Sequence, residues 1–169
     1  MSSFALVLNN QIIQIDPEQF PVASGLSWTT DISAISPAPQ VGWTAQETAG
    51  AWSFTAPAAP TLAQQAQALL AAGVCRIAST ASPAIDGTYA IDPNSRAMLG
   101  EIIAGINAGD GLPGGGASFI YDDAQGAHSF TEGSQVLAVG KGLRDFIYAA
   151  MQVVQGRAEA LPAQPWPIP

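Results

Sequence analysis

Basic residues are scarce in this 169-residue chain, and none occurs before Arg76. The chain has 5 Lys and Arg residues against 13 Asp and Glu residues, which gives a formal net charge of −8. Proteins that bind nucleic acids place clusters of Lys and Arg against the phosphate backbone. Since the few basic residues here are also scattered, the sequence argues against a nucleic-acid partner.

Cysteine is almost absent, because Cys75 is the only one in the chain. One cysteine excludes an internal disulfide, and the Cys/His spacings that are typical of zinc sites do not occur. Arg76 beside it is the kind of neighbour that activates a thiol, but we expect Cys75 to be a buried structural residue. We predict no metal site and no cofactor.

Long apolar runs are also missing. No stretch approaches the roughly 18 apolar residues of a membrane span, and residues 1–10 lack the cationic region and cleavage pattern of a signal peptide. We therefore expect a chain that is made in a cytoplasm and has no membrane partner. Charged residues make up only 11% of the chain, against about 25% in a typical soluble domain. Such a surface suits packing against other subunits.

The first strand signals come at the start of the chain. Residues 4–8 and 11–15 are two β-prone runs around Asn9 and Asn10, a pair that tolerates the positive φ of a tight turn. They predict a β-hairpin.

A second hairpin is expected from residues 41–44 and 51–55, with Gly50 near its turn. Residues 1–56 thus predict a small antiparallel β domain, in which aromatic residues must serve as most of the core. Three of the four tryptophans lie here. Two interpretations apply to Trp28, Trp43 and Trp52: core residues, which we favour, or a platform on which sugar rings stack.

A proline-rich linker at residues 57–60 separates this domain from residues 61–160. In the second part, apolar periodicity and capping signals predict helices over residues 62–72, 93–108 and 132–158. Strands are expected over residues 74–79, 88–92, 117–121 and 127–130. The fold class is therefore α+β, with the C-terminal sheet packed against three helices, the last one long.

Gly140 and Gly142 interrupt the long helix and indicate close approach of another backbone, within this chain rather than from a partner subunit. Residues 161–169 form a Pro/Trp-rich tail that alternating prolines keep extended. We expect this tail to be a partner-binding anchor, whose removal leaves the fold intact but weakens partner binding. Its candidate contact residues are Pro165, Trp166, Pro167 and Ile168.

No catalytic site is predicted. His128 is the only histidine, and its neighbour Ser129 points to the opposite face of a strand, which makes a Ser–His pair sterically poor. The aspartate pairs Asp86/Asp92 and Asp122/Asp123 are interpreted as turn and cap residues rather than as general acids or metal ligands.

Two stretches carry a resemblance to a known family. The first is residues 4–13 with the segments 41–44 and 52–57; the second is residues 86–96 with the segment 119–131 and the long helix that follows. Together they resemble small proteins encoded beside the tail-fibre genes of bacteriophages and prophages. The chain departs from that family after its first helix, where Gln64, Gln65 and Gln67 replace the charged helix that the family leads us to expect.

The resemblance implies a non-enzymatic structural or adaptor protein of the virion tail, which contacts tail-fibre or baseplate chains. Two alternatives stay open: a tail-fibre assembly chaperone that is not retained in the virion, and a carbohydrate- or receptor-binding module at the tail tip. By resemblance alone, a homo-oligomer of three copies or a multiple of three is compatible with such a role.

Overall fold

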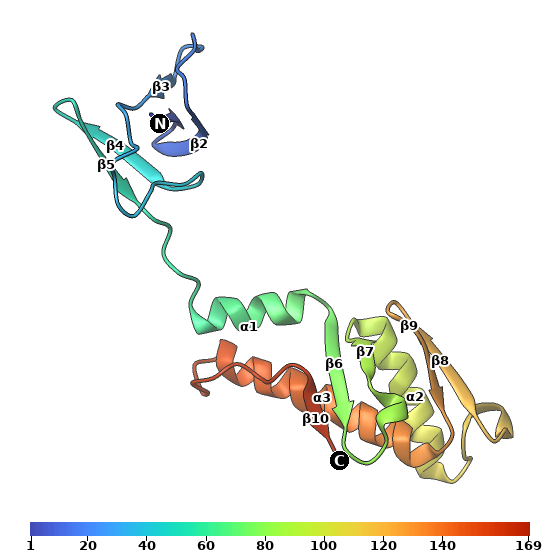
Figure 1. Ribbon diagram of the computed structural model, residues 1–169. Coiled ribbons are helices and arrows are strands. Elements are labelled where there is room, and N and C mark those ends of the chain that lie inside the picture. Colours follow the sequence, from blue (N-terminus) through green and yellow to red (C-terminus); the bar gives the residue numbers. More distant parts are fainter. The chain divides into compact units, whose positions relative to one another are not determined.

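The computed structural model describes all 169 residues, which divide into two compact units, Met1–Ala59 and Pro60–Pro169 (Figure 1). Each unit has its own hydrophobic cluster. The predicted α+β class is confirmed, with three helices of which the last is the longest, at 22 residues. None of the three combines the length and apolar character that a membrane crossing requires.

The first unit is a five-stranded antiparallel sheet. Its strands are β1 (Phe4–Leu8), β2 (Gln11–Asp16), β3 (Leu26–Trp28), β4 (Thr44–Thr48) and β5 (Ala51–Thr55), in the spatial order β3-β1-β2-β4-β5. The hairpin of β1 and β2 is confirmed. Asn9 and Asn10 have φ values of 51° and 62°, which a two-residue hairpin turn requires.

The second hairpin forms, but its first strand starts later than predicted. β4 begins at Thr44 rather than at residue 41, because Gly42 has a φ of 90° and breaks the extended backbone. Ala49 and Gly50 then make the turn, both with positive φ. Strand β3 was not predicted at all, since its three residues are too few to show an alternating pattern.

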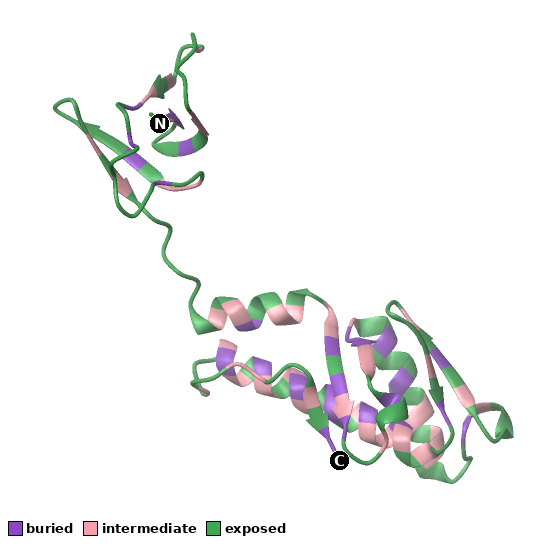
Figure 2. Cartoon of the chain, in the orientation of Figure 1, coloured by how far each residue is buried: buried purple, intermediate pink, exposed green.

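Small aliphatic residues, rather than tryptophans, fill the fully buried core of this unit. Its members are Ala5, Val7, Ile12, Ile32 and Ala45. Trp43, Trp52 and Phe54 pack around them and remain partly exposed. The expectation of a mainly aromatic core is therefore wrong, and Figure 2 shows how little of the unit is buried.

The second unit contains three helices, a three-stranded sheet and a separate hairpin. Its helices and sheet strands are α1 (Leu62–Ala71), β6 (Val74–Ser79), β7 (Gly87–Ala90), α2 (Pro93–Ala108), α3 (Gly133–Val154) and β10 (Trp166–Ile168), and its hairpin strands are β8 (Phe119–Asp123) and β9 (Gly126–Phe130). Short 3₁₀ turns occupy Pro83–Ile85 and Pro113–Gly115. The sheet order is β10-β6-β7, with β10 parallel to β6 and β7 antiparallel to it.

The helix boundaries follow the capping residues. Thr61 caps α1 and Asp92 caps α2, as the sequence indicates, and α2 ends at Gly109 in the left-handed conformation. The long helix is shorter than expected. Glu132, the first residue of the predicted range, is its N-cap, in a reciprocal capping box with Gln135, and its last residue is Val154 rather than about 158.

The core of the second unit gathers around one face of α3, where buried residues recur from Val136 to Val153 (Figure 2). The two glycines of α3 lie where neighbours approach most closely. A Cβ on Gly140 would collide with the Ile103 side chain of α2, and one on Gly142 would lie 2.6 Å from Ile168 Cγ2. Both close approaches come from this chain, as predicted, but side chains rather than a backbone make them.

The proline-rich tail ends as a strand of this sheet. Trp166 and Ile168 pair with Ile77 and Ser79 of β6, and the Ser79 hydroxyl donates to the Pro169 carbonyl over 3.0 Å. Ile168 is 4% exposed and belongs to the main core. The tail is thus a structural edge strand of its own unit.

Candidate functional site

A groove between the helices of the second unit is lined mainly by apolar side chains. It joins a hollow of about 200 Å³ between α2 and α3 to one of about 430 Å³ between α1, the start of α2 and α3, and both share Arg96 and Ile147. We call it the helix groove. Its main lining residues are Leu70, Ile91, Arg96, Leu99, Ile103, Leu143, Arg144, Ile147 and Met151.

The residues of the helix groove come from apolar stripes that the sequence shows only as core. Leu99 and Leu143 are buried as predicted, but Ile147 is only partly buried and Met151 is 39% exposed. Helix α3 therefore carries more apolar surface than its own unit covers. Met98 of α2 and Leu62 of α1 are also exposed, at 42% and 43%.

Two arginines line the helix groove, and one of them has no ion-pair partner. Arg96 and Arg144 are two of the five basic residues of the chain. Arg96 forms no ion pair, whereas Arg144 contacts its neighbour Asp145 over 2.8 Å and helps to hold the pKa of that carboxyl below its usual value. Asp92 also lines the groove, but its carboxylate already accepts hydrogen bonds from the backbone of Asn94 and Ser95.

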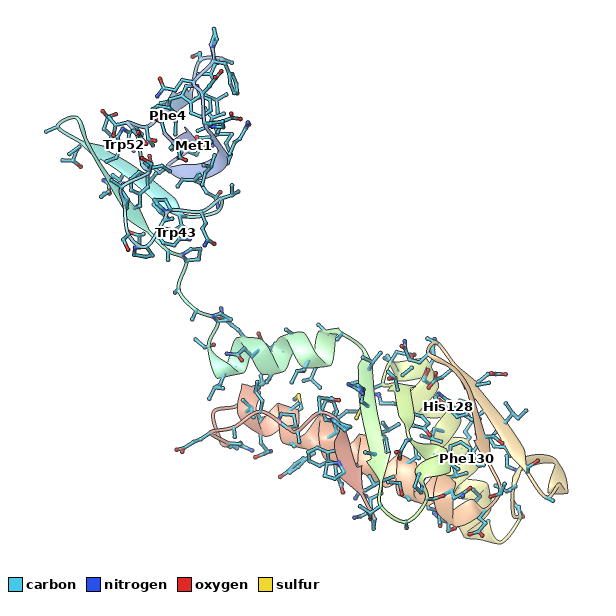
Figure 3. The ribbon with its side chains drawn as sticks, viewed as in Figure 1. Met1, Phe4, Trp43, Trp52, His128 and Phe130 are labelled. Atoms are coloured by element: carbon cyan, nitrogen blue, oxygen red, sulfur yellow. The ribbon has the colours of Figure 1, made fainter.

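The single histidine lies in a packed polar cluster that holds the hairpin against β7. The His128 ring stacks on Tyr89 with centroids 4.0 Å apart, and its Nε2 lies 3.3 Å from Asp123 Oδ1. The buried Asp123 carboxylate also accepts from the backbone N–H groups of Ala90 and Gln125. Figure 3 labels His128 in this hairpin.

This cluster satisfies its own hydrogen bonds. Tyr89 and Tyr121 donate to the carbonyls of Ile85 and Ser95, and burial raises the pKa of both hydroxyls. Asp123 supplies an acceptor to the Ala90 N–H at the edge of the sheet, where a further strand would otherwise bond. These contacts hold the hairpin of β8 and β9 against β7.

The other candidate catalytic or metal-binding residues have structural surroundings. Asp86 accepts from the Ser79 N–H over 2.6 Å, and Asp92 caps α2. Ser129 is exposed on the face opposite His128. Burial raises the pKa of the Cys75 thiol to about 12, which makes it a poor nucleophile near neutral pH. No group of three or more His, Cys, Asp or Glu residues could hold a metal ion.

The three tryptophans of the first unit have different surroundings, and Figure 3 labels two of them, Trp43 and Trp52. Trp28 packs edge-on against Phe20 at 4.9 Å, and its Nε1 donates to the Phe20 carbonyl. Trp43 packs against the core. Trp52 alone lines a hollow, of about 410 Å³. The structure therefore does not bring the three into one platform.

The four candidate contact residues of the tail also differ in burial. Pro165 and Pro167 are exposed, Trp166 is partly buried against Phe146 at a centroid distance of 6.0 Å, and Ile168 is in the core. The prediction that Ile168 projects as an anchor for a partner is wrong, because β6 and α3 of this chain already cover it.

No family model, curated protein or solved structure matches this chain.

Proposed function

We propose that this chain is a non-enzymatic structural adaptor of a bacteriophage or prophage tail, which contacts tail-fibre or baseplate chains. The stretches that resemble the tail-fibre-associated family are the reason for assigning the chain to a phage tail. The helix groove is the observation that supports contact as the mode of action, because it offers apolar surface at hollows of a size that side chains fill.

The charges at the helix groove support a partner segment that carries a carboxylate. In a chain of net charge −8, Arg96 stands without an ion-pair partner beside partly exposed apolar side chains. An apolar segment that carries a carboxylate complements both features, and opposite charge at the rim of such a contact favours correct docking. The adaptor therefore binds an amphipathic, acidic segment of a tail protein.

Glutamate substitutions at the helix groove test this proposal. Met151→Glu and Arg96→Glu should each weaken co-purification with the tail-fibre or baseplate chain at least ten-fold. Met98→Glu and Arg157→Glu are matched controls, because Met98 is equally exposed on α2 and Arg157 is exposed after α3, both outside the groove. Equal retention of the partner by the groove variants and their controls would refute the proposal.

Retention in the virion distinguishes the adaptor from the assembly chaperone. The tail of the chain does not favour either role, because its own sheet accounts for its order. Mass spectrometry of purified particles should find the chain at the tail if it is an adaptor. Its absence from particles, with groove-dependent binding intact in the cell, would identify the chaperone instead.

A further inference from the structure

Strand β5 is an edge of the five-stranded sheet, and its outer side has no neighbouring strand (Figure 1). Ala45, which lies opposite Phe54 in the ladder, donates its backbone N–H to the Asn10 carbonyl on the other side of β4. Because backbone groups alternate in direction along an antiparallel strand, those of Phe54 and Trp52 point away from β4. No other part of the chain bonds to them. β5 therefore offers two N–H and two C=O groups to a further strand.

The other edges of the two sheets are protected against such pairing. β3 has only three residues, and β10 contains Pro167, which has no N–H to donate. At β7, the Asp123 carboxylate accepts the N–H of Ala90. Short strands, prolines and blocking side chains are the means by which proteins prevent edge pairing. β5 is instead a regular strand of five uncharged residues, in unbroken register with β4, which makes it the edge best suited to pairing.

The outward groups of β5 are complementary to those of a second copy of the strand. In an antiparallel pair that places Ser53 opposite Ser53 of the partner subunit, each Trp52 lies opposite a Phe54. Both residues then exchange both of their backbone hydrogen bonds with the facing strand. A shift by two residues in either direction would place Trp52 or Phe54 opposite a residue outside the strand. One register thus satisfies every outward group of both strands.

The side chains of β5 fit the same register. Trp52 and Phe54 share one face of the strand, stack with ring centroids 6.5 Å apart and are both partly exposed. Two copies would continue this row of rings across the new pair, and aromatic cross-strand pairs are favourable.

The carboxylates of the two copies stay apart in this arrangement. Glu47 lies on β4, one strand away from the edge. Three strand spacings separate Glu47 from Glu47 of the partner subunit, which is at least about 14 Å. Salt screens charges beyond about 8 Å at physiological ionic strength. The acidic character of the first unit therefore does not oppose the contact.

We propose that two copies of this protein associate through antiparallel pairing of their β5 strands, which joins the sheets of both first units into one. The contact is isologous and uses the same edge of both copies, so it stops at two. Because a single five-residue strand pairs on each side, the dimer is weak, with a Kd on the order of 10–100 μM. This inference does not rest on the adaptor proposal, because the helix groove belongs to the second unit.

Sedimentation velocity of the full-length protein over a range of concentrations tests the proposal. Ser53 is exposed and faces its own copy at the two-fold axis, so Ser53→Lys should weaken dimerisation about five-fold through repulsion of like charges. Ser53→Asp should do the same, whereas a mixture of the two variants should form a heterodimer. Gln46→Lys is the matched control. Gln46 is exposed and pairs directly with Ser53, but on β4, and its substitution should leave dimerisation unchanged.

A disulfide tests the register. The two Ser53 Cα atoms of the proposed pair are about 4.5 Å apart, a separation that a disulfide spans. Ser53→Cys should therefore form a covalent dimer under mild oxidation much faster than Gln46→Cys, and the native Cys75 is buried in both. The proposal is overturned if the wild-type chain sediments as a monomer at every concentration, if Ser53→Lys and Ser53→Asp do not pair when mixed, or if the two cysteine variants cross-link at equal rates.

Discussion

Single glycines show how closely the helices of the second unit are packed. At Gly142 of α3, an added Cβ would meet Ile168 at 2.6 Å and Ile77 at 3.2 Å, whereas at Gly100 of α2 it would meet nothing within 4 Å. Both residues lie inside helices, where Ala is favoured over Gly by up to about 1 kcal/mol. The same substitution therefore has opposite consequences at the two positions.

Gly142→Ala should destabilise the protein, because the new methyl group displaces β10 from α3. We expect a loss of about 1–3 kcal/mol in the free energy of unfolding, the cost of overpacking a core. Gly100→Ala should instead raise it by a few tenths to about 1 kcal/mol. Urea titration followed by circular dichroism measures both values, and a neutral or stabilising Gly142→Ala would contradict the packing described.

At the same scale, the sequence indicates the close approach at Gly140 and Gly142 but not what approaches. Glycine within a helix costs stability. Two glycines as close together as Gly140 and Gly142 therefore indicate that a neighbouring element packs closely against the helix there. That Ile168 is the neighbour of Gly142 depends on the fold of the tail, 26 residues further along the chain in sequence. Local patterns carry no information on contacts of such separation.

At the scale of elements, the sequence predicts those with a local signal. Thr61 and Asp92 mark the helix starts, and Asn9-Asn10 marks the hairpin turn. The Trp166–Ile168 strand has no such signal, because its prolines favour an extended conformation whether or not a sheet pairs with it. Pro167 has no backbone N–H to donate, which an edge strand tolerates.

The helix groove is harder to predict from sequence than the elements that form it. Ile147 and Met151 fit the periodic stripe of a core helix, and their exposure depends on where α1 and α2 end. The groove therefore results from the tertiary arrangement of the helices.

The sequence leads us to expect that removal of the tail leaves the fold intact, but the pairing of β10 with β6 leads to the opposite prediction. Because Ile168 is in the core, removal of the tail should destabilise the second unit. Ile168→Ala isolates this effect and should cost about 2–5 kcal/mol in the free energy of unfolding. Ile120→Ala is the matched control, since Ile120 is 61% exposed on β8, and it should change stability by less than about 0.5 kcal/mol.

The Cys75 thiol reports the same change directly. It is buried on β6, the strand with which β10 pairs, and burial raises its pKa to about 12. Native protein should react slowly with a disulfide reagent at neutral pH, and Ile168→Ala should accelerate the reaction several-fold by loosening β10. Equal labelling rates in the Ile168 and Ile120 variants would show that β10 does not protect the thiol.

For the molecule as a whole, the two units have separate means of stabilisation. The first has a small aliphatic core with partly exposed tryptophans, and the second has a large core around α3. The helices and most of the tryptophans lie in different units, so two spectroscopic signals can be assigned to the units separately. All three helices belong to the second unit, whereas Trp28, Trp43 and Trp52 belong to the first. Once Trp166 of the second unit is replaced, helical circular dichroism and tryptophan fluorescence report on different units.

Two cores should therefore give two unfolding transitions. In a Trp166→Phe background, Leu143→Ala should lower the urea midpoint of the helical signal by removing about 2–5 kcal/mol of stability and leave the fluorescence midpoint in place. Ile12→Val should do the reverse, at a cost of about 0.5–1.5 kcal/mol. Non-coincident probes are the sign that unfolding is not two-state. If each variant shifts both signals equally, the two cores unfold as one cooperative unit and the expectation of two transitions is wrong.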